Sequence, residues 1–148
     1  MLEFSPLTWD YPPTPTLDLT PENVRYHLEG QVISAINIVN SVIPEIIERG
    51  DGSLLFTTGI TAFYPLSQVG NLSIAMAALR SYISTLHMEL TDKGIVVANR
   101  SLGVGIKAGT GDVNDPDVIA DMWYQVYSEK ISGEDLYPHG VTPATMVY

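Results

Sequence analysis

Hydrophobic and polar residues follow two different periods along this chain. Short, mostly apolar runs at residues 2–4, 54–58 and 95–98 predict buried β-strands. Over residues 21–49 and 72–93 the apolar residues recur every three or four positions, which is the period of an α-helix. A third helical pattern covers about residues 115–130. Strands that alternate with long helices predict an α/β fold with parallel strands and right-handed crossovers.

The ends of the two long helices carry typical boundary residues. Thr20 and Pro21 suit the N-cap and the first helical position of the first helix, and Gly50 suits its C-terminal end. Pro44 lies inside this helix and is expected to bend it. Gly94 ends the second helix in the same way as Gly50 ends the first.

Both long helices are apolar on two sides, which is more than one sheet face requires. In a three-stranded parallel sheet, two successive right-handed crossovers place both helices on the same face. Only the third helix and residues 131–148, which we expect to form an irregular tail, remain to cover the other face. We therefore expect one domain over residues 1–148 whose core is completed by oligomerisation. The simplest form is a homodimer through helices 21–49 and 72–93.

Composition limits the classes of partner and the compartment. The chain has 148 residues, 45% of them hydrophobic, no Cys and a formal net charge of −10. This charge disfavours nucleic acid and anionic membranes. There is no run of eighteen apolar residues, so no membrane-spanning helix is expected. The N-terminal residues lack the pattern of a signal peptide, and we expect a cytoplasmic protein.

The segment GSLLFTTGITAFYPLSQVGNLSIAMAAL, residues 52–79, resembles the middle of a short-chain dehydrogenase/reductase (SDR). That family has a Ser at the end of a strand, a Tyr thirteen residues later and a Lys four residues after the Tyr. These three positions fall on Gly59, Leu72 and Met76 here. The resemblance therefore implies that the groups which orient the substrate and move the proton during hydride transfer are missing.

The resemblance extends over about residues 2–105 and includes the segments LEFSP and KGIVVANRSLGVGI. It implies a partial Rossmann-like, SDR-type parallel sheet. The helix residue that is usually Asn in this family, and that helps to hold a catalytic water, falls on Gln31. The Gly-rich dinucleotide turn of the family belongs to a unit upstream of the matched segments, and no G-x-G-x-x-G follows a strand here. We therefore expect no NAD(P) and no other cofactor, and no spacing of His, Asp or Glu indicates a metal site.

Ligands of open parallel sheets bind beyond the carboxyl ends of the strands. His27 lies one helical turn before Gln31 on the side of the helix nearer this edge, and an imidazole there could act as a general acid or base. The alternative is a surface or capping histidine. Thr58 either replaces the missing Ser as a donor to a carbonyl or satisfies a backbone group at the strand end.

Further candidates for substrate binding come from strand ends, loops and the start of the second helix. Their alternative roles are loop structure, helix capping and ordinary packing. Met76 in place of a Lys makes the floor of this region apolar, which suits a hydrophobic substrate. The candidates are Ser5, Trp9, Tyr11, Thr57, Tyr64, Asn71, Leu72 and Met76.

Three functions are compatible with these residues. The first is a cofactor-independent, redox-neutral enzyme, a lyase, cyclase or isomerase. It would act on a hydrophobic carbonyl substrate by dehydration, conjugate addition, cyclisation or isomerisation, and a place in natural-product biosynthesis would fit it. The second is a non-catalytic SDR-like binding or scaffold protein. The third is a residual NAD(P)-dependent oxidoreductase that borrows a nucleotide-binding half from another chain.

Overall fold

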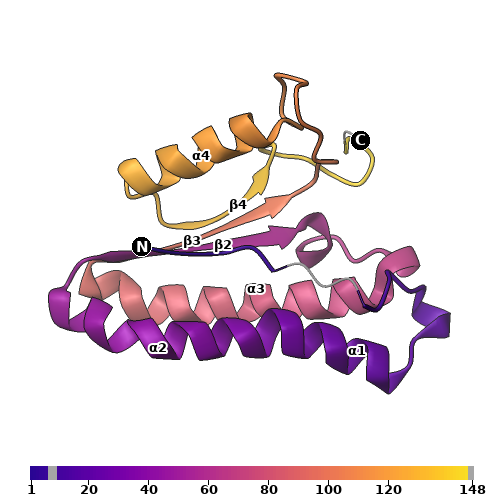
Figure 1. Cartoon of the computed structure of the whole chain (residues 1–148), viewed down its shortest axis with the longest axis horizontal. Helices are drawn as coiled ribbons and strands as arrows, with labels where there is room; N and C mark the ends of the chain where they lie inside the picture. Colours follow the sequence, from indigo (N-terminus) through magenta and orange to yellow (C-terminus); the bar gives the residue numbers. More distant parts are fainter. Residues whose placement is uncertain (7–9, 147–148) are drawn as a thin grey trace.

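A computed structural model describes residues 1–6 and 10–146 of the chain. Over these residues four parallel strands form one sheet in the order β1-β2-β3-β4 (Figure 1). The strands are β1 (Leu2–Phe4), β2 (Gly52–Gly59), β3 (Ile95–Leu102) and β4 (Gly133–Tyr137). Thr58 of β2 is opposite Ser101 of β3, so the carboxyl ends of these two strands meet at the same edge. The α/β fold with parallel strands and crossover helices, predicted from the sequence, is confirmed.

Within the described residues, four α-helices and a short π-helical segment lie in the connections between the strands. Thr20 caps the first helix by accepting a hydrogen bond from the backbone N–H of Asn23 at 3.2 Å, and Gly50 ends it with a φ of 67°. Asp115 caps the last helix through the N–H of Asp117 at 3.1 Å. The helical segments are α1 (Pro21–Leu28), the π-helical Glu29–Ile33, α2 (Ser34–Arg49), α3 (Gly70–Leu90) and α4 (Pro116–Ser128).

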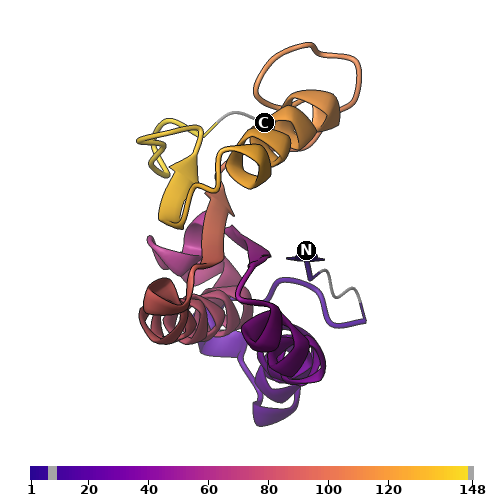
Figure 2. The same ribbon diagram turned by 90° about the vertical axis from the view of Figure 1, so that its left-hand side faces the viewer.

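The helices cover the two faces of the sheet unequally. The α1–α2 helix and α3 lie side by side on one face, and α4 lies on the other (Figures 1 and 2). The larger core cluster lies between the sheet and α2 and α3, and includes Val39, Phe56 and Leu79. The smaller cluster joins Leu55 and Ala98 to Val126 of α4. Side chains of odd and even positions on β3 therefore face different helices.

The C-terminal part of the chain differs from the sequence-based expectation. Residues 131–148 were expected to be an irregular tail, but they contain β4, which pairs with β3. The sheet thus has four strands over the described residues instead of three. The strand GEDLY has few apolar residues, so hydrophobic pattern does not mark it. Pairing with β3 and the ion pair between Glu134 and Arg80, with an N–O distance of 2.6 Å, stabilise it instead.

The long helical segment Pro21–Arg49 has to be compared with the expectation that no helix of this chain spans a membrane. By length and composition alone it is apolar enough to cross a membrane, with a hydropathy of 1.3 over an eighteen-residue window. Only 22% of that window is buried. Core helices can pass the same test, and the inner side of this helix packs on the sheet through Ala35, Val39 and Ile46. The apolar side chains on its outer side stay exposed in the single chain.

Candidate functional site

The positions that the family resemblance assigns to hydride chemistry do meet in space. The backbone N–H of Gly59 donates to the Sδ atom of Met76 at 3.4 Å. Leu72 lies one turn before Met76 on α3 and is half-buried. The end of β2 and the first turns of α3 thus bring together a glycine, a thioether and an aliphatic side chain. None of these groups can donate or accept a proton at neutral pH.

His27 and Gln31 are buried together in the helix that precedes β2. Their exposed fractions are 0% and 1%. The Nε2 atom of His27 lies 3.1 Å from the carbonyl oxygen of Tyr11, and Nδ1 lies 3.4 Å from Nε2 of Gln31. Since a carbonyl only accepts, Nε2 carries the proton and Nδ1 accepts from Gln31. Burial lowers the pKa of His27, so the ring is neutral, and it holds the loop at Tyr11 against the helix.

His27 is therefore not the surface histidine that the sequence left open as an alternative. Gln31 lies in the π-helical segment Glu29–Ile33, an irregularity that often occurs at functional sites. The sequence places both residues on one helix face, and the hydrogen bond between them agrees with this. The described contacts occupy both ring nitrogens of His27, so a direct acid–base role would require one of these contacts to break. Such a role stays a prediction.

Thr58 belongs to a buried network of side chains inside the sheet. Thr58 is only 2% exposed, and its hydroxyl donates to Oδ1 of Asn99 at 3.1 Å. It also shares a short hydrogen bond with the hydroxyl of Ser101. These partners are side chains of β3, whereas the sequence left open either a donor to a substrate carbonyl or a bond to a strand-end backbone group. Sequence reasoning missed Asn99 because the predicted apolar run ends at Ala98, whereas β3 continues to Leu102.

A second polar cluster lies at the ends of β1 and β2 on the opposite side of the sheet from Thr58. The Ser5 hydroxyl is 2.7 Å from the Thr57 hydroxyl and also donates to the carboxylate of Glu3. Thr57 lies 3.4 Å from the same carboxylate. The sequence predicted Ser5 and Thr57 as site residues, and the structure brings them together. Glu3 was missed, although its position two residues before Ser5 on a strand places both side chains on one face.

Two of the remaining candidates, Asn71 and Tyr11, belong to or hold the loop that joins β1 to α1. Asn71 is 0% exposed, and it accepts from the N–H of Thr14 at 2.9 Å and donates to the carbonyl of Pro12 at 3.0 Å. The Tyr11 ring is 40% exposed, with its centroid 5.0 Å from that of Tyr26. Tyr64 is 37% exposed and Trp9 lies outside the described residues. Within residues 1–6 and 10–146, no group of three or more His, Asp or Glu is placed to hold a metal ion.

Known proteins show which family this arrangement is similar to. No protein-family model matches the chain. Over 81 residues it is 28% and 31% identical to dehydrogenase/reductase SDR family member 4 of Sus scrofa and of Oryctolagus cuniculus. These matches cover 55% of this chain and 29% and 31% of the two relatives.

Solved structures extend the likeness over most of the chain. Acetoin dehydrogenase from Enterobacter cloacae superposes with a TM-score of 0.75 and 16% identity, covering 90% of this chain and 61% of the other. The chain is a short-chain dehydrogenase/reductase-like protein. A 4-hydroxyisoleucine dehydrogenase complexed with NADH has a TM-score of 0.75 at 14% identity, covering 90% of this SDR-like chain and 65% of the other. A halohydrin dehalogenase has a TM-score of 0.63 at 19% identity, covering 80% and 47%.

The SDR-like chain spans about three tenths of the length of the curated relatives that it matches. At these identities, the likeness to solved structures shows the fold and not an activity. Relatedness to SDR oxidoreductases agrees with the resemblance that residues 2–105 carry. The SDR-like fold, with its parallel sheet and crossover helices, is therefore confirmed, and the chemistry has to be argued from this chain's own residues.

Proposed function

We propose that the SDR-like chain is a redox-neutral enzyme that acts on a hydrophobic carbonyl compound without a nicotinamide cofactor. One observation carries the proposal: Gly59 and Met76 are in contact, with Leu72 one turn away, where the family resemblance implies Ser, Lys and Tyr. These residues form an apolar floor and offer no phenol or ammonium for hydride transfer. Dehydration, conjugate addition, cyclisation and isomerisation do not need those groups.

Such reactions need a base and a donor to the carbonyl oxygen, and the cluster of Glu3, Ser5 and Thr57 offers both. Glu3 and Ser5 are exposed, so a ligand can reach them. Thr57 and Gly59 are two residues apart on β2, which separates their Cα atoms by about 7 Å. In this proposal the substrate extends past the carboxyl end of β2, where the cluster and the apolar floor both lie. In this proposal Glu3 removes a proton next to the carbonyl, and the hydroxyls stabilise the enolate oxygen.

His27 and Gln31 have a supporting part in this proposal. Their hydrogen bonds fix the loop at Tyr11, which leads from β1 toward α1. Thr58 likewise holds β2 to β3 through Asn99. These three residues keep the strand ends and the loop in place, while the exposed cluster contacts the substrate.

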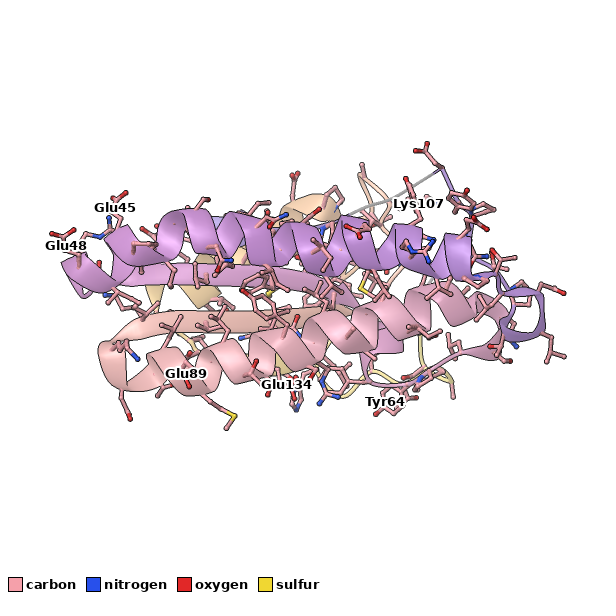
Figure 3. All side chains as sticks on the ribbon, turned by 90° about the horizontal axis from the view of Figure 1, so that it is seen from below. Glu45, Glu48, Tyr64, Glu89, Lys107 and Glu134 are labelled. Carbon is pink, nitrogen blue, oxygen red and sulfur yellow. The ribbon has the colours of Figure 1, made fainter. Side chains whose placement is uncertain are left out.

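The test uses proton abstraction itself, because it needs no knowledge of the natural substrate. The methyl ketone 4-phenyl-2-butanone is incubated with the protein in D₂O, and loss of its α-proton signal is followed by NMR. We expect exchange faster than in buffer, and a reduction of about 10²–10⁴-fold in the variant Glu3→Gln. Glu48→Gln, at an exposed position near the end of α2 (Figure 3), is the matched control and should exchange like the wild type. Equal rates for wild type and Glu3→Gln would contradict the proposal.

A non-catalytic binding or scaffold protein is the second candidate, and the outer helix surface favours it. Ile33, Ile38, Ile47, Ile74 and Met88 on the α1–α2 helix and α3 are between 36% and 74% exposed. Such apolar side chains on neighbouring helices are typical of a surface that another protein covers. Absence of any protein-dependent exchange, together with stable association through this surface, would favour this second function. A residual oxidoreductase is supported only by the names of the relatives, which include dehydrogenases.

A further inference from the structure

A cavity of about 60 Å³ lies between α3 and the strands β3 and β4, on the face of the sheet that α2 and α3 cover. Ile83, Ser84 and His87 line it from α3, Val97 and Asn99 from β3, and Glu134 from β4. One buried water needs about 10–15 Å³ of such space, so the cavity has room for a molecule of a few heavy atoms. Its lining does not include Glu3, Ser5 or Thr57, so a ligand in this cavity is independent of the proposed function.

Asn99 directs an unsatisfied polar group into this cavity. Its side chain is 1% exposed, and its Oδ1 atom accepts a hydrogen bond from Thr58 of β2. Its Nδ2 atom is buried and has no hydrogen-bond partner among the described residues. Because β3 lies between β2 and β4, an amide with its oxygen toward β2 turns its nitrogen toward β4 and the cavity. A buried donor without a partner is costly, so an acceptor at this position would be stabilising.

Two further groups at the cavity can donate or accept. The Ser84 hydroxyl makes no hydrogen bond within the described part of the chain, and Ser84 is exposed at the helix surface. The His87 ring is held through Nδ1, which lies 3.2 Å from the Ser132 hydroxyl. Its Nε2 atom has no hydrogen-bond partner in residues 1–6 and 10–146. The cavity thus offers a donor from β3 and groups of either kind from α3.

The charged residue of the cavity is already neutralised. Both carboxylate oxygens of Glu134 accept from Arg80, at 2.7 Å from Nε and 2.6 Å from Nη2. Arg80 also lies over the Phe63 ring at 3.8 Å from its centroid. Its partner Glu134 lies beside α3 (Figure 3). The remaining walls, Ile83 and Val97, are aliphatic. A charged ligand would find no unpaired, permanently charged counter-ion here, whereas a short alkyl group would find apolar contacts.

We propose that this cavity binds a small, uncharged, hydroxyl-bearing molecule such as a short-chain alcohol. The ligand hydroxyl accepts from Asn99 Nδ2 and donates to Ser84 or His87, and its alkyl part contacts Ile83 and Val97. A hydroxyl suits the site better than a carbonyl because it can accept from Asn99 and also donate to Ser84 or His87, whereas a carbonyl can only accept.

The probe for this site is 2-propanol, with acetate as a charged molecule of the same size. Titration of ¹⁵N-labelled protein is followed through the side-chain amide signal of Asn99. We expect a saturable shift with 2-propanol at millimolar concentrations and none with acetate, because a ligand of so few atoms cannot bind tightly. The variant Ser84→Leu should fill the mouth of the cavity and raise the dissociation constant about tenfold or more.

Ser81→Leu is the matched control, since it places the same side chain one turn earlier on the exposed surface of α3 without lining the cavity. It should bind 2-propanol like the wild type, and circular dichroism should show that both variants are folded. Three results would overturn the proposal: no saturable shift, equal shifts for 2-propanol and acetate, or equal binding by Ser84→Leu. The first would mean that no alcohol enters the cavity, the second that the site does not select an uncharged ligand, and the third that the ligand binds elsewhere.

Discussion

At the level of single residues, burial decides what His27 does. The ring is 0% exposed and bridges the carbonyl of Tyr11 and the side chain of Gln31. Protonation would put a second proton on Nδ1, where Gln31 already donates, and would place a charge in an apolar site. Both effects favour the neutral ring. Burial lowers the pKa of His27 from its ordinary value of 6.5, although the Tyr11 carbonyl opposes this shift in part.

A lowered folded-state pKa predicts a particular dependence of stability on pH. Above pH 6.5 His27 is neutral in both the folded and the unfolded chain, and its contribution to the free energy of unfolding is complete. As the pH falls below 6.5, the unfolded chain binds a proton that the folded chain does not, so stability is lost until the folded pKa is passed. Urea unfolding followed from pH 8 to 5 should show this loss.

Variants separate His27 from the other titrating groups. His27→Gln should lower the free energy of unfolding at pH 8 by about 1–3 kcal/mol, because two buried partners lose their hydrogen bonds. The same variant should lack the His-dependent loss between pH 6.5 and 5. His139→Gln, at a side chain that is 88% exposed, should keep the wild-type profile. An unchanged pH profile in His27→Gln would mean that His27 is not the titrating group.

At the level of secondary-structure elements, local signals in the sequence located most boundaries. Thr20, Gly50 and Asp115 lie at helix ends as the capping rules predict, because these signals depend on a few neighbouring residues. The π-helical segment Glu29–Ile33 has no such signal, since its apolar residues keep the helical spacing. Pro44 lies within α2, where the sequence predicted a bend.

The errors in the sheet have a common cause. The second half of β3 contains Asn99, Arg100 and Ser101, and β4 contains two acids, so neither segment has an apolar pattern. Their polar side chains form hydrogen bonds with partners that are distant in sequence, such as Thr58 with Oδ1 of Asn99. Arg100 donates to the carbonyl of Gly133 at 3.1 Å. Hydrogen bonds of this kind follow from the tertiary fold, so the candidate site could be predicted only in part.

The loop between β1 and α1 depends on α3, and Asn71 makes the connection. Asn71→Ala removes an acceptor for the N–H of Thr14 and a donor to the carbonyl of Pro12. Because Asn71 is 0% exposed, these groups cannot regain water easily. We expect the free energy of unfolding to fall by about 2 kcal/mol. Limited proteolysis should also cleave residues 10–19 faster than in the wild type.

Asn40→Ala is the matched control for Asn71→Ala, because Asn40 is exposed on α2. It should leave both stability and proteolysis close to wild type. Asn71→Asp keeps the acceptor for Thr14 but places an anion beside the carbonyl of Pro12, so it should destabilise the loop as well. If Asn71→Ala were as stable and as resistant as Asn40→Ala, the loop would be held by other contacts.

At the level of the whole molecule, we propose that the outer surface of the α1–α2 helix and α3 forms a homodimer interface. These helices lie side by side (Figure 3), and Ile38 and Ile74 on them are 36% and 43% exposed. Burying such side chains against a second copy removes apolar surface from water. Sedimentation velocity at micromolar concentration should show a dimer. The double variant with Ile38→Glu and Ile74→Glu should be a monomer, because it would bury unpaired charges.

Tyr124→Glu is the control for the dimer, since Tyr124 is 70% exposed on α4, on the opposite face of the sheet. This variant should remain dimeric. A wild-type protein that sediments as a monomer would exclude the homodimer and leave the apolar helix surface for a different partner.

The cofactor question also belongs to the whole chain, because a dinucleotide would contact several strands and helices at once. We expect no measurable affinity for NAD or NADP. The end of β2 and the start of α3 present Gly59, Leu72 and Met76, which supply no cation or hydroxyl for the nicotinamide ribose. The net charge of −10 adds a general repulsion against the pyrophosphate. Isothermal titration calorimetry with all four nicotinamide dinucleotides, oxidised and reduced, measures this directly.

The triple variant with Gly59→Ser, Leu72→Tyr and Met76→Lys tests why the wild-type chain would not bind a nicotinamide dinucleotide. If the apolar floor alone prevents binding, this variant should gain affinity that the wild type lacks. If it also fails to bind, groups outside the floor are missing as well, and the redox-neutral proposal stands on both grounds. A low-micromolar dissociation constant for the wild-type chain would instead mean that another surface binds the phosphates. In that event the residual oxidoreductase, the function that the names of the relatives favour, would replace the redox-neutral enzyme.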